Sequence, residues 1–143
     1  MIQIKGNFDA IKKWLDKETE KYEPAKAVVY LSTPFENRKG IWQQYGTKRG
    51  IPPRPWFGVR EDFEPTLEKI KHHWLISDQT VRELIQDIAN ALIANIKEGV
   101  NKQTDIWGKP FVPLKPQTIR RKRSSKALID KGHMINSVVW KWL

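Results

Sequence analysis

The strongest hydrophobic pattern in the chain lies between residues 78 and 98. Its apolar residues recur at the three- and four-residue spacing of one helical face: Val81, Leu84, Ile85, Ile88, Leu92 and Ile96. This spacing predicts a long amphipathic helix that ends near Gly99, because glycine is common just past a helix C-terminus. A second helical pattern spans residues 63–74, and the sequence leaves open whether Ser77, a possible cap, and Asp78 separate the two.

Strand patterns occur far apart along the chain. Residues 27–31 are apolar and rich in β-branched side chains, which predicts a buried strand, and the alternation at residues 138–142 predicts another. Residues 41–45 are predicted to form a further strand after a polar loop at residues 36–40. Residues 8–22 have the apolar spacing of a short amphipathic N-terminal helix.

A proline-rich segment separates these elements from the helices. Prolines at positions 52, 53 and 55 exclude both a helix and a central strand, so residues 50–58 should be extended and stiff. Such an arm, spanning about residues 47–58, would present Arg54, Trp56 and Phe57 to a partner with little entropy left to lose. The alternative is that Trp56 and Phe57 fold back and cover the domain's own core.

Positive charge is concentrated at the C-terminal end. The net charge is +10, and residues 101–143 hold ten Lys and Arg against two Asp and Glu. A basic loop at about residues 101–126 could contact phosphates, an anionic membrane or an acidic protein surface, or it could only be solvated. Residues 117–122 should form one or two helical turns, and residues 127–137 have a weaker helical pattern.

The remaining composition points away from catalysis. The chain has 143 residues, the size of one domain, and it contains no cysteine and three histidines. His72 and His73 are adjacent and cannot bind one ion from a single helical face, so we expect neither a metal nor a cofactor. We therefore predict that the protein is not an enzyme. No apolar run could span a membrane, whereas the seven tryptophans favour protein interfaces.

Two sequence blocks resemble phage tail-completion and virion-morphogenesis proteins. The first is Tyr45-Gly46-Thr47 followed by Ile51-Pro52-Pro53-Arg54-Pro55-Trp56-Phe57-Gly58, similar to the family's F/Y-G-T and I-P-A-R-P-F-L-G. The second runs from Trp107-Gly108-Lys109-Pro110-Phe111-Val112-Pro113-Leu114 through Thr118 and Lys122 to Leu128-Ile129-Asp130-Lys131-Gly132-His133-Met134 and Ser137-Val138. It resembles W-x-P-L-x-P-x-T-x-x-x-K and I-L-x-x-T-G-x-L-x-x-S-I.

The chain departs from the family pattern in two ways. Lys131 stands where the family has threonine, and the two blocks come in the opposite order along the chain. A circular permutation or an arrangement particular to this chain would explain the order. The resemblance implies an α+β fold of residues 1–143, in which a small twisted, mainly antiparallel sheet packs against the long helix and the N-terminal helix.

The same resemblance implies a structural role in the virion. The chain would be made in the host cytoplasm and would form a ring, usually a hexamer, between the head connector and the tail tube. It would contact neighbouring neck or tail-terminator proteins, and phage DNA only transiently. The expected interface residues are Arg54, Trp56, Phe57, Trp107 and Leu114, and the expected phosphate or lumen contacts are Lys115, Arg120, Arg121, Lys122 and Arg123.

Two other functions stay open at this point. The basic segment with Trp107 or Trp140 could form a non-specific nucleic-acid-binding module, in which phosphates and bases contact those side chains. A small nuclease or toxin is the third option, although its metal ligands are missing from the sequence pattern.

Overall fold

A computed structural model describes residues 26–122 and 124–143. Its elements are β1 (Ala27–Leu31), α2 (Pro34–Tyr45), the short 3-10 turn η1 (Glu61–Phe63), α3 (Glu64–Ile76), α4 (Val81–Asn101), α5 (Pro116–Lys122), α6 (His133–Asn136) and β2 (Val138–Trp142). The predicted α+β class is confirmed. The predicted N-terminal helix at residues 8–22 lies outside the described residues.

The two predicted strands at the ends of the described sequence pair with each other. β1 and β2 are antiparallel, with Ala27 opposite Trp142 and Leu31 opposite Val138. α4 packs against both strands, and the centre of the core is formed by the fully buried side chains of Ile96, Val100 and Val138. The long helix and the sheet therefore form one core, as the apolar stripe of α4 predicts.

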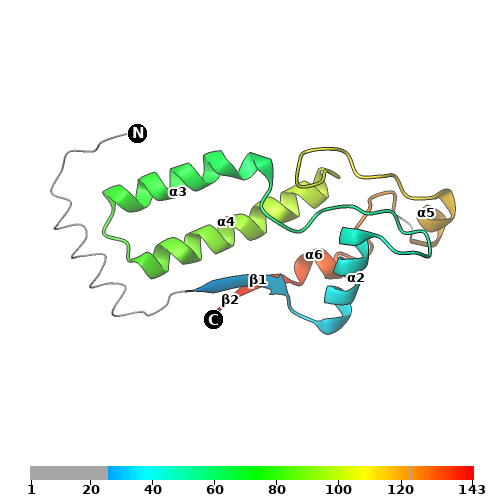
Figure 1. Cartoon of the computed structure of the whole chain (residues 1–143), viewed down its shortest axis with the longest axis horizontal. Coiled ribbons are helices and arrows are strands. Elements are labelled where there is room, and N and C mark those ends of the chain that lie inside the picture. Colours follow the sequence, from blue (N-terminus) through cyan, green and yellow to red (C-terminus); the bar gives the residue numbers. More distant parts are fainter. Residues whose placement is uncertain (1–25, 123) are drawn as a thin grey trace.

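The helical region splits into a hairpin. α3 ends at Ile76 with Ser77 as its C-cap. α4 begins with a capping box in which the Thr80 side chain accepts from the Glu83 backbone while the Glu83 side chain accepts from the Thr80 backbone. The cap is thus Thr80 and not Ser77. Figure 1 shows α3 and α4 side by side at one end of an elongated molecule, with α2 and α5 towards the other end.

The helix α2 corrects the sequence prediction of a loop followed by a strand. Thr33 is its N-cap and accepts from the Glu36 backbone at 3.2 Å, Pro34 occupies the first turn, and Gly46 ends the helix at φ 74°. The strand prediction was wrong because the apolar residues of α2 form no buried stripe. Most of them face solvent. The helix therefore lacks the apolar stripe, repeated every three or four residues, by which a sequence indicates a buried helical face.

The C-terminal region confirms one predicted helix and shortens another. α5 coincides with the turns expected at residues 117–122. The weak helical pattern at residues 127–137 becomes the single turn α6, because Leu128 takes a left-handed conformation at φ 66° and helix cannot continue through it.

A buried arginine fastens the C-terminal end of α4 to the loops beside it. Arg60 is 5% exposed, and all five of its N–H donors have acceptors. They bind both carboxylate oxygens of Asp62 (3.1 Å each), the carbonyls of Thr104 and Asp105 (3.2 and 2.9 Å) and the Thr104 hydroxyl (3.1 Å). Gly99 is buried inside α4 and does not end it, and a Cβ there would overlap the Arg60 guanidinium. Glycine is needed at this position for close approach rather than for a helix end.

Candidate functional site

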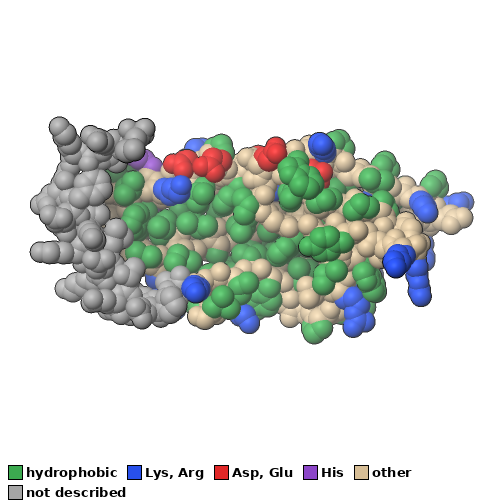
Figure 2. All heavy atoms as spheres, viewed as in Figure 1, with side chains coloured by type: hydrophobic (Ala, Val, Ile, Leu, Met, Phe, Trp, Pro, Cys, Tyr) green, Lys and Arg blue, Asp and Glu red, His purple; other side chains and the backbone are tan. Residues whose placement is uncertain are grey.

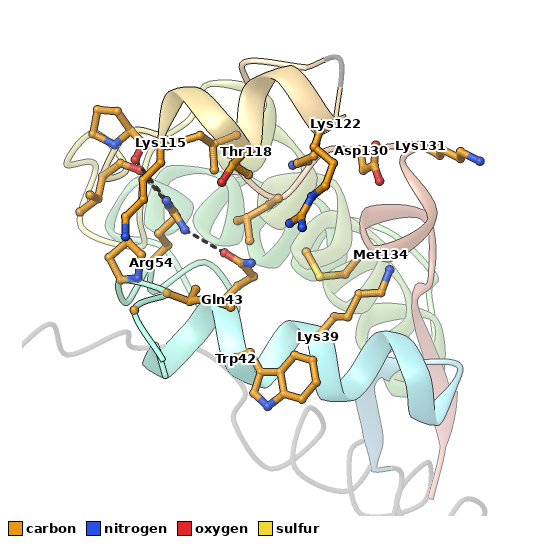
Figure 3. A pocket seen from close by; sticks show the side chains of 18 of the residues that line it. Lys39, Trp42, Gln43, Arg54, Lys115, Thr118, Lys122, Asp130, Lys131 and Met134 are labelled. Atoms are coloured by element: carbon orange, nitrogen blue, oxygen red, sulfur yellow. Dashed lines mark hydrogen bonds between the residues drawn. The ribbon is translucent and has the colours of Figure 1, made fainter. Parts of the chain in front are cut away.

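A pocket of about 660 Å³ lies between α2, the extended segment before Arg54, the segment after Phe111, α5 and the turn that leads into α6. Both motif blocks contribute to its walls. The pocket is lined by one carboxylate, that of Asp130, and by six cationic side chains. These cations are Lys39, Arg54, Lys115, Arg121, Lys122 and Lys131. In Figure 3, Lys39 from α2 and Lys122 from α5 point into the hollow from opposite walls.

Arg54 joins the two motif blocks. Its Nε donates to the Val112 carbonyl (2.8 Å), Nη2 to the Pro113 carbonyl (3.4 Å) and Nη1 to Oε1 of Gln43 (3.0 Å), the contact drawn in Figure 3. Its backbone N–H also donates to the Gln43 carbonyl at 2.7 Å. Arg54 is 3% exposed, and burial lowers its pKa. The prediction that a free arm presents Arg54 is therefore wrong: the segment is extended but folds onto its own domain.

The aromatic pair beside Arg54 also turns inward. Trp56 is 2% exposed, its indole N–H donates to the Gly40 carbonyl at 3.1 Å, and its ring meets the half-buried Phe57 edge to face. Oε1 of Gln44 accepts from both backbone N–H groups at 2.9 and 3.0 Å. The alternative in which these aromatics cover the domain's own core is confirmed for Trp56. The prediction that Trp56 is exposed on an arm is wrong, because the proline-rich segment runs across α2.

The second block places its predicted interface residues differently. Trp107 is 51% exposed on a turn held by Asp105, whose carboxylate accepts from the backbone N–H groups of Trp107 and Lys109 at 2.9 Å each. Leu114 is half-buried, packs against the core and lines the pocket. Trp107 is therefore available to a partner, whereas Leu114 serves mainly as a wall.

The predicted phosphate contacts divide into two groups. Lys115, Arg121 and Lys122 line the pocket, whereas Arg120 is exposed on α5 outside the pocket lining, and Arg123 is not among the described residues. Burial lowers the pKa of Lys122, with smaller contributions from the positive charges of Arg54 and Lys39, while Asp130 opposes the change. The structure thus concentrates positive potential inside the hollow.

The contribution of α2 to the pocket differs from the loop and strand predicted for these residues. Lys39, Trp42 and Gln43 line the pocket. Other exposed apolar side chains of the same helix lie outside the pocket lining: Phe35, Ile41 and Tyr45. The signal that could have found this helix is Thr33-Pro34-Phe35-Glu36, a hydroxyl cap with glutamate three residues later and proline at the first position.

The charges are distributed unevenly over the surface. Figure 2 shows Lys and Arg side chains gathered at the end that holds α5, whereas several Asp and Glu side chains lie towards α3. Of the residues that the structure describes, no three His, Cys, Asp or Glu side chains are grouped so that they could hold a metal ion. Over the same residues, none of the helices has both the length and the apolar character needed to cross a membrane.

The chain matches no family model, no curated protein and no solved structure.

Proposed function

We propose that this chain is a structural, non-catalytic virion protein that completes a phage tail or neck by forming a ring between the head connector and the tail tube. The observation that carries the proposal is the contact between the two motif blocks. Arg54 of the first block binds the carbonyls of Val112 and Pro113 in the second. The two resemblances therefore fall in one structural unit, although their order along the chain is reversed.

The exposed apolar surface is suited to subunit contacts. A ring held by head-to-tail contacts needs two different complementary patches on each subunit. α2 offers one, with exposed Phe35, Ile41 and Tyr45, and Trp107 offers aromatic surface on a separate turn. Aromatic side chains are the usual anchors of protein interfaces, so these residues replace Arg54 and Trp56 as the proposed contacts.

The mass of the full chain in solution tests the ring. Analytical ultracentrifugation, alone and with tails purified from particles that lack this protein, should give a closed oligomer, six times the 16.8 kDa chain mass for a hexamer. Phe35→Ser together with Tyr45→Ser should weaken association and leave the circular dichroism spectrum unchanged. Leu75→Ser, which alters an exposed apolar residue on α3, is the matched control. A chain that stays monomeric both alone and with tails would contradict the proposal.

A non-specific nucleic-acid-binding module is the second candidate function. The observation that favours it is the cationic group Lys115, Arg120, Arg121 and Lys122 at one end of the molecule. This function requires submicromolar binding to duplex DNA that falls steeply with salt, because binding releases condensed counterions. The ring requires only weak contact, since a tight grip on DNA would oppose its passage. A tightly DNA-binding monomer would establish the module and exclude the ring.

A further inference from the structure

The cations of the pocket lack a matching set of carboxylates. Within the described part of the chain, Lys39 forms an ion pair with Glu36 at 3.2 Å, and the other five pocket cations form none. Arg54 donates only to neutral oxygens, and Lys122 Nζ donates to the Lys126 carbonyl at 3.4 Å. Of these five, Arg54 is buried and Lys122 is half-buried, whereas Lys115, Arg121 and Lys131 are exposed. Removing a cation from water without a counter-charge costs free energy, and an anion bound beside Arg54 and Lys122 would recover part of it.

Most of the remaining pocket wall is apolar, although Gln43, Thr118, Asp130 and His133 also line it. Trp42 comes from α2, Ile51 and Pro52 from the extended segment, and Leu128 and Met134 from the region around α6. A ligand that fills this hollow must therefore place apolar groups beside its negative charge. Duplex DNA presents phosphates on a broad polar surface and has no apolar side chains to offer, whereas a peptide can supply both.

We propose that this pocket binds an extended peptide segment of a neighbouring particle protein, with a carboxylate between apolar side chains. The identity of the neighbour rests on the proposed function, while the chemistry of the peptide rests on the pocket. The carboxylate would meet Arg121 and Lys122, and the flanking side chains would pack on Trp42 and Met134. Arg120, on the same helix but outside the pocket lining, takes no part.

The methionines provide a direct probe of occupancy. The chain has two, and Met134 lines the pocket, so methyl-labelled methionine gives a spectrum with two signals that Met134→Leu assigns. The probe ligand is a short blocked peptide of alternating leucine and glutamate, with a glutamine-for-glutamate version as its control. The acidic peptide should shift the Met134 methyl signal saturably, and the glutamine peptide should bind at least roughly tenfold more weakly.

Neighbouring arginines on α5 make matched variants. Arg121→Gln should weaken the acidic peptide by roughly tenfold, because it removes a charge-assisted contact, whereas Arg120→Gln should change affinity by no more than about twofold. Arg121 is exposed, so its substitution should leave the fold intact, which circular dichroism checks. Equal weakening by the two variants would show general attraction to a basic surface and overturn the pocket.

Further outcomes separate this site from the ring. An unchanged Met134 signal at saturating peptide, or equal binding of the glutamine peptide, would reject the pocket. A duplex oligonucleotide that shifts Met134 at lower concentration than the peptide would reject it in favour of a phosphate site. If the chain forms a ring but does not bind the peptide, only the peptide pocket is rejected. If the chain binds the peptide but stays monomeric, only the ring is rejected.

Discussion

Arg54 and Arg60 lie six positions apart, and both are almost completely buried, yet their surroundings differ. Arg60 uses all five N–H donors and binds both oxygens of the Asp62 carboxylate. Arg54 makes three side-chain hydrogen bonds, to two carbonyls and an amide oxygen, and it lines a hollow. The guanidinium of Arg60 pairs with a carboxylate, whereas that of Arg54 has no carboxylate partner among the residues that the structure describes.

This difference separates stability from recognition. A buried arginine whose donors are satisfied and whose charge is balanced fixes the loops around it, and removing it leaves buried acceptors without partners. A buried arginine that meets only neutral acceptors holds its segments together but also projects positive potential into the neighbouring space. The region of Arg60 is therefore expected to respond to mutation as a structural clamp, and the region of Arg54 as part of a binding site.

The largest effect is expected where α4 approaches Arg60. Gly99→Ala should destabilise the protein by roughly 3 kcal/mol in urea unfolding, because the new methyl group displaces the guanidinium from its charged and neutral acceptors. Helix propensity alone predicts the opposite sign, a gain of about 1 kcal/mol.

A double-mutant cycle isolates that contact. In an Arg60→Ala background, which should itself cost roughly 3 kcal/mol, Gly99→Ala should become neutral or stabilising. Additive losses in the double variant would mean that Gly99 is required for another reason.

Arg54→Met comes next and should cost roughly 1–2 kcal/mol, less than Arg60→Met. The variant loses three hydrogen bonds but also removes a buried charge that has no carboxylate partner among the described residues. Urea unfolding of both variants under the same conditions measures the difference. A larger loss for Arg54→Met would remove the distinction between the two arginines.

The carboxylate of the balanced pair gives a pH-dependent prediction. The hydrogen bond from Arg60 holds the pKa of Asp62 below its usual value, and Asn95 and nearby positive charges act in the same direction. The stabilisation is therefore complete above the unfolded pKa and is lost as pH falls through the lower folded pKa.

Asp62→Asn should thus lower the free energy of unfolding at neutral pH by less than about 1 kcal/mol, since the side chain is half exposed, and urea unfolding at several pH values measures this loss. The deficit should shrink as the pH falls below about 4, the usual pKa of an aspartate, and vanish once Asp62 is protonated in the folded protein. A deficit that is the same at acidic and neutral pH would contradict the ionic role.

The smallest effect on stability is expected at Lys122. Lys122→Met keeps the apolar stem and removes a half-buried cation, so unfolding free energy should change by no more than about 0.5 kcal/mol. The same variant should weaken the acidic peptide, whereas exposed Lys109→Met should change neither property. A large loss of stability would make Lys122 a structural residue.

Parts of the fold were predictable because their patterns are local. The apolar stripe of α4, the β-branched run of β1 and the terminal alternation of β2 all survive in the structure. The helix α2 was not predicted, because its aromatic residues are exposed. The rule that apolar positions mark the buried face of an element does not hold there. Gly99 was placed at a helix end because sequence alone gives no sign of a guanidinium packed against it.

Three of the six cations that line the pocket were predicted from the sequence, but the geometry of the pocket was not. Lys115, Arg121 and Lys122 were found from charge alone. Lys39 and Gln43 lie in another part of the sequence and reach the site only because Arg54 draws α2 and the segment after Phe111 together. No local sequence pattern indicates that Arg54 brings these segments together, because its acceptors Gln43, Val112 and Pro113 lie in distant parts of the sequence.

The pairing of β1 with β2 has a consequence for the order of events during synthesis. The hairpin of α3 and α4 joins neighbouring parts of the sequence, but Ala27 pairs with Trp142. Contacts at such separation pay a loop-closure entropy and slow folding. Until residues 138–142 have been made, β1 and the apolar side of α4 lack Val138 to cover them. Apolar surface exposed in that interval is prone to aggregation, and the pairing of β2 with β1 covers it.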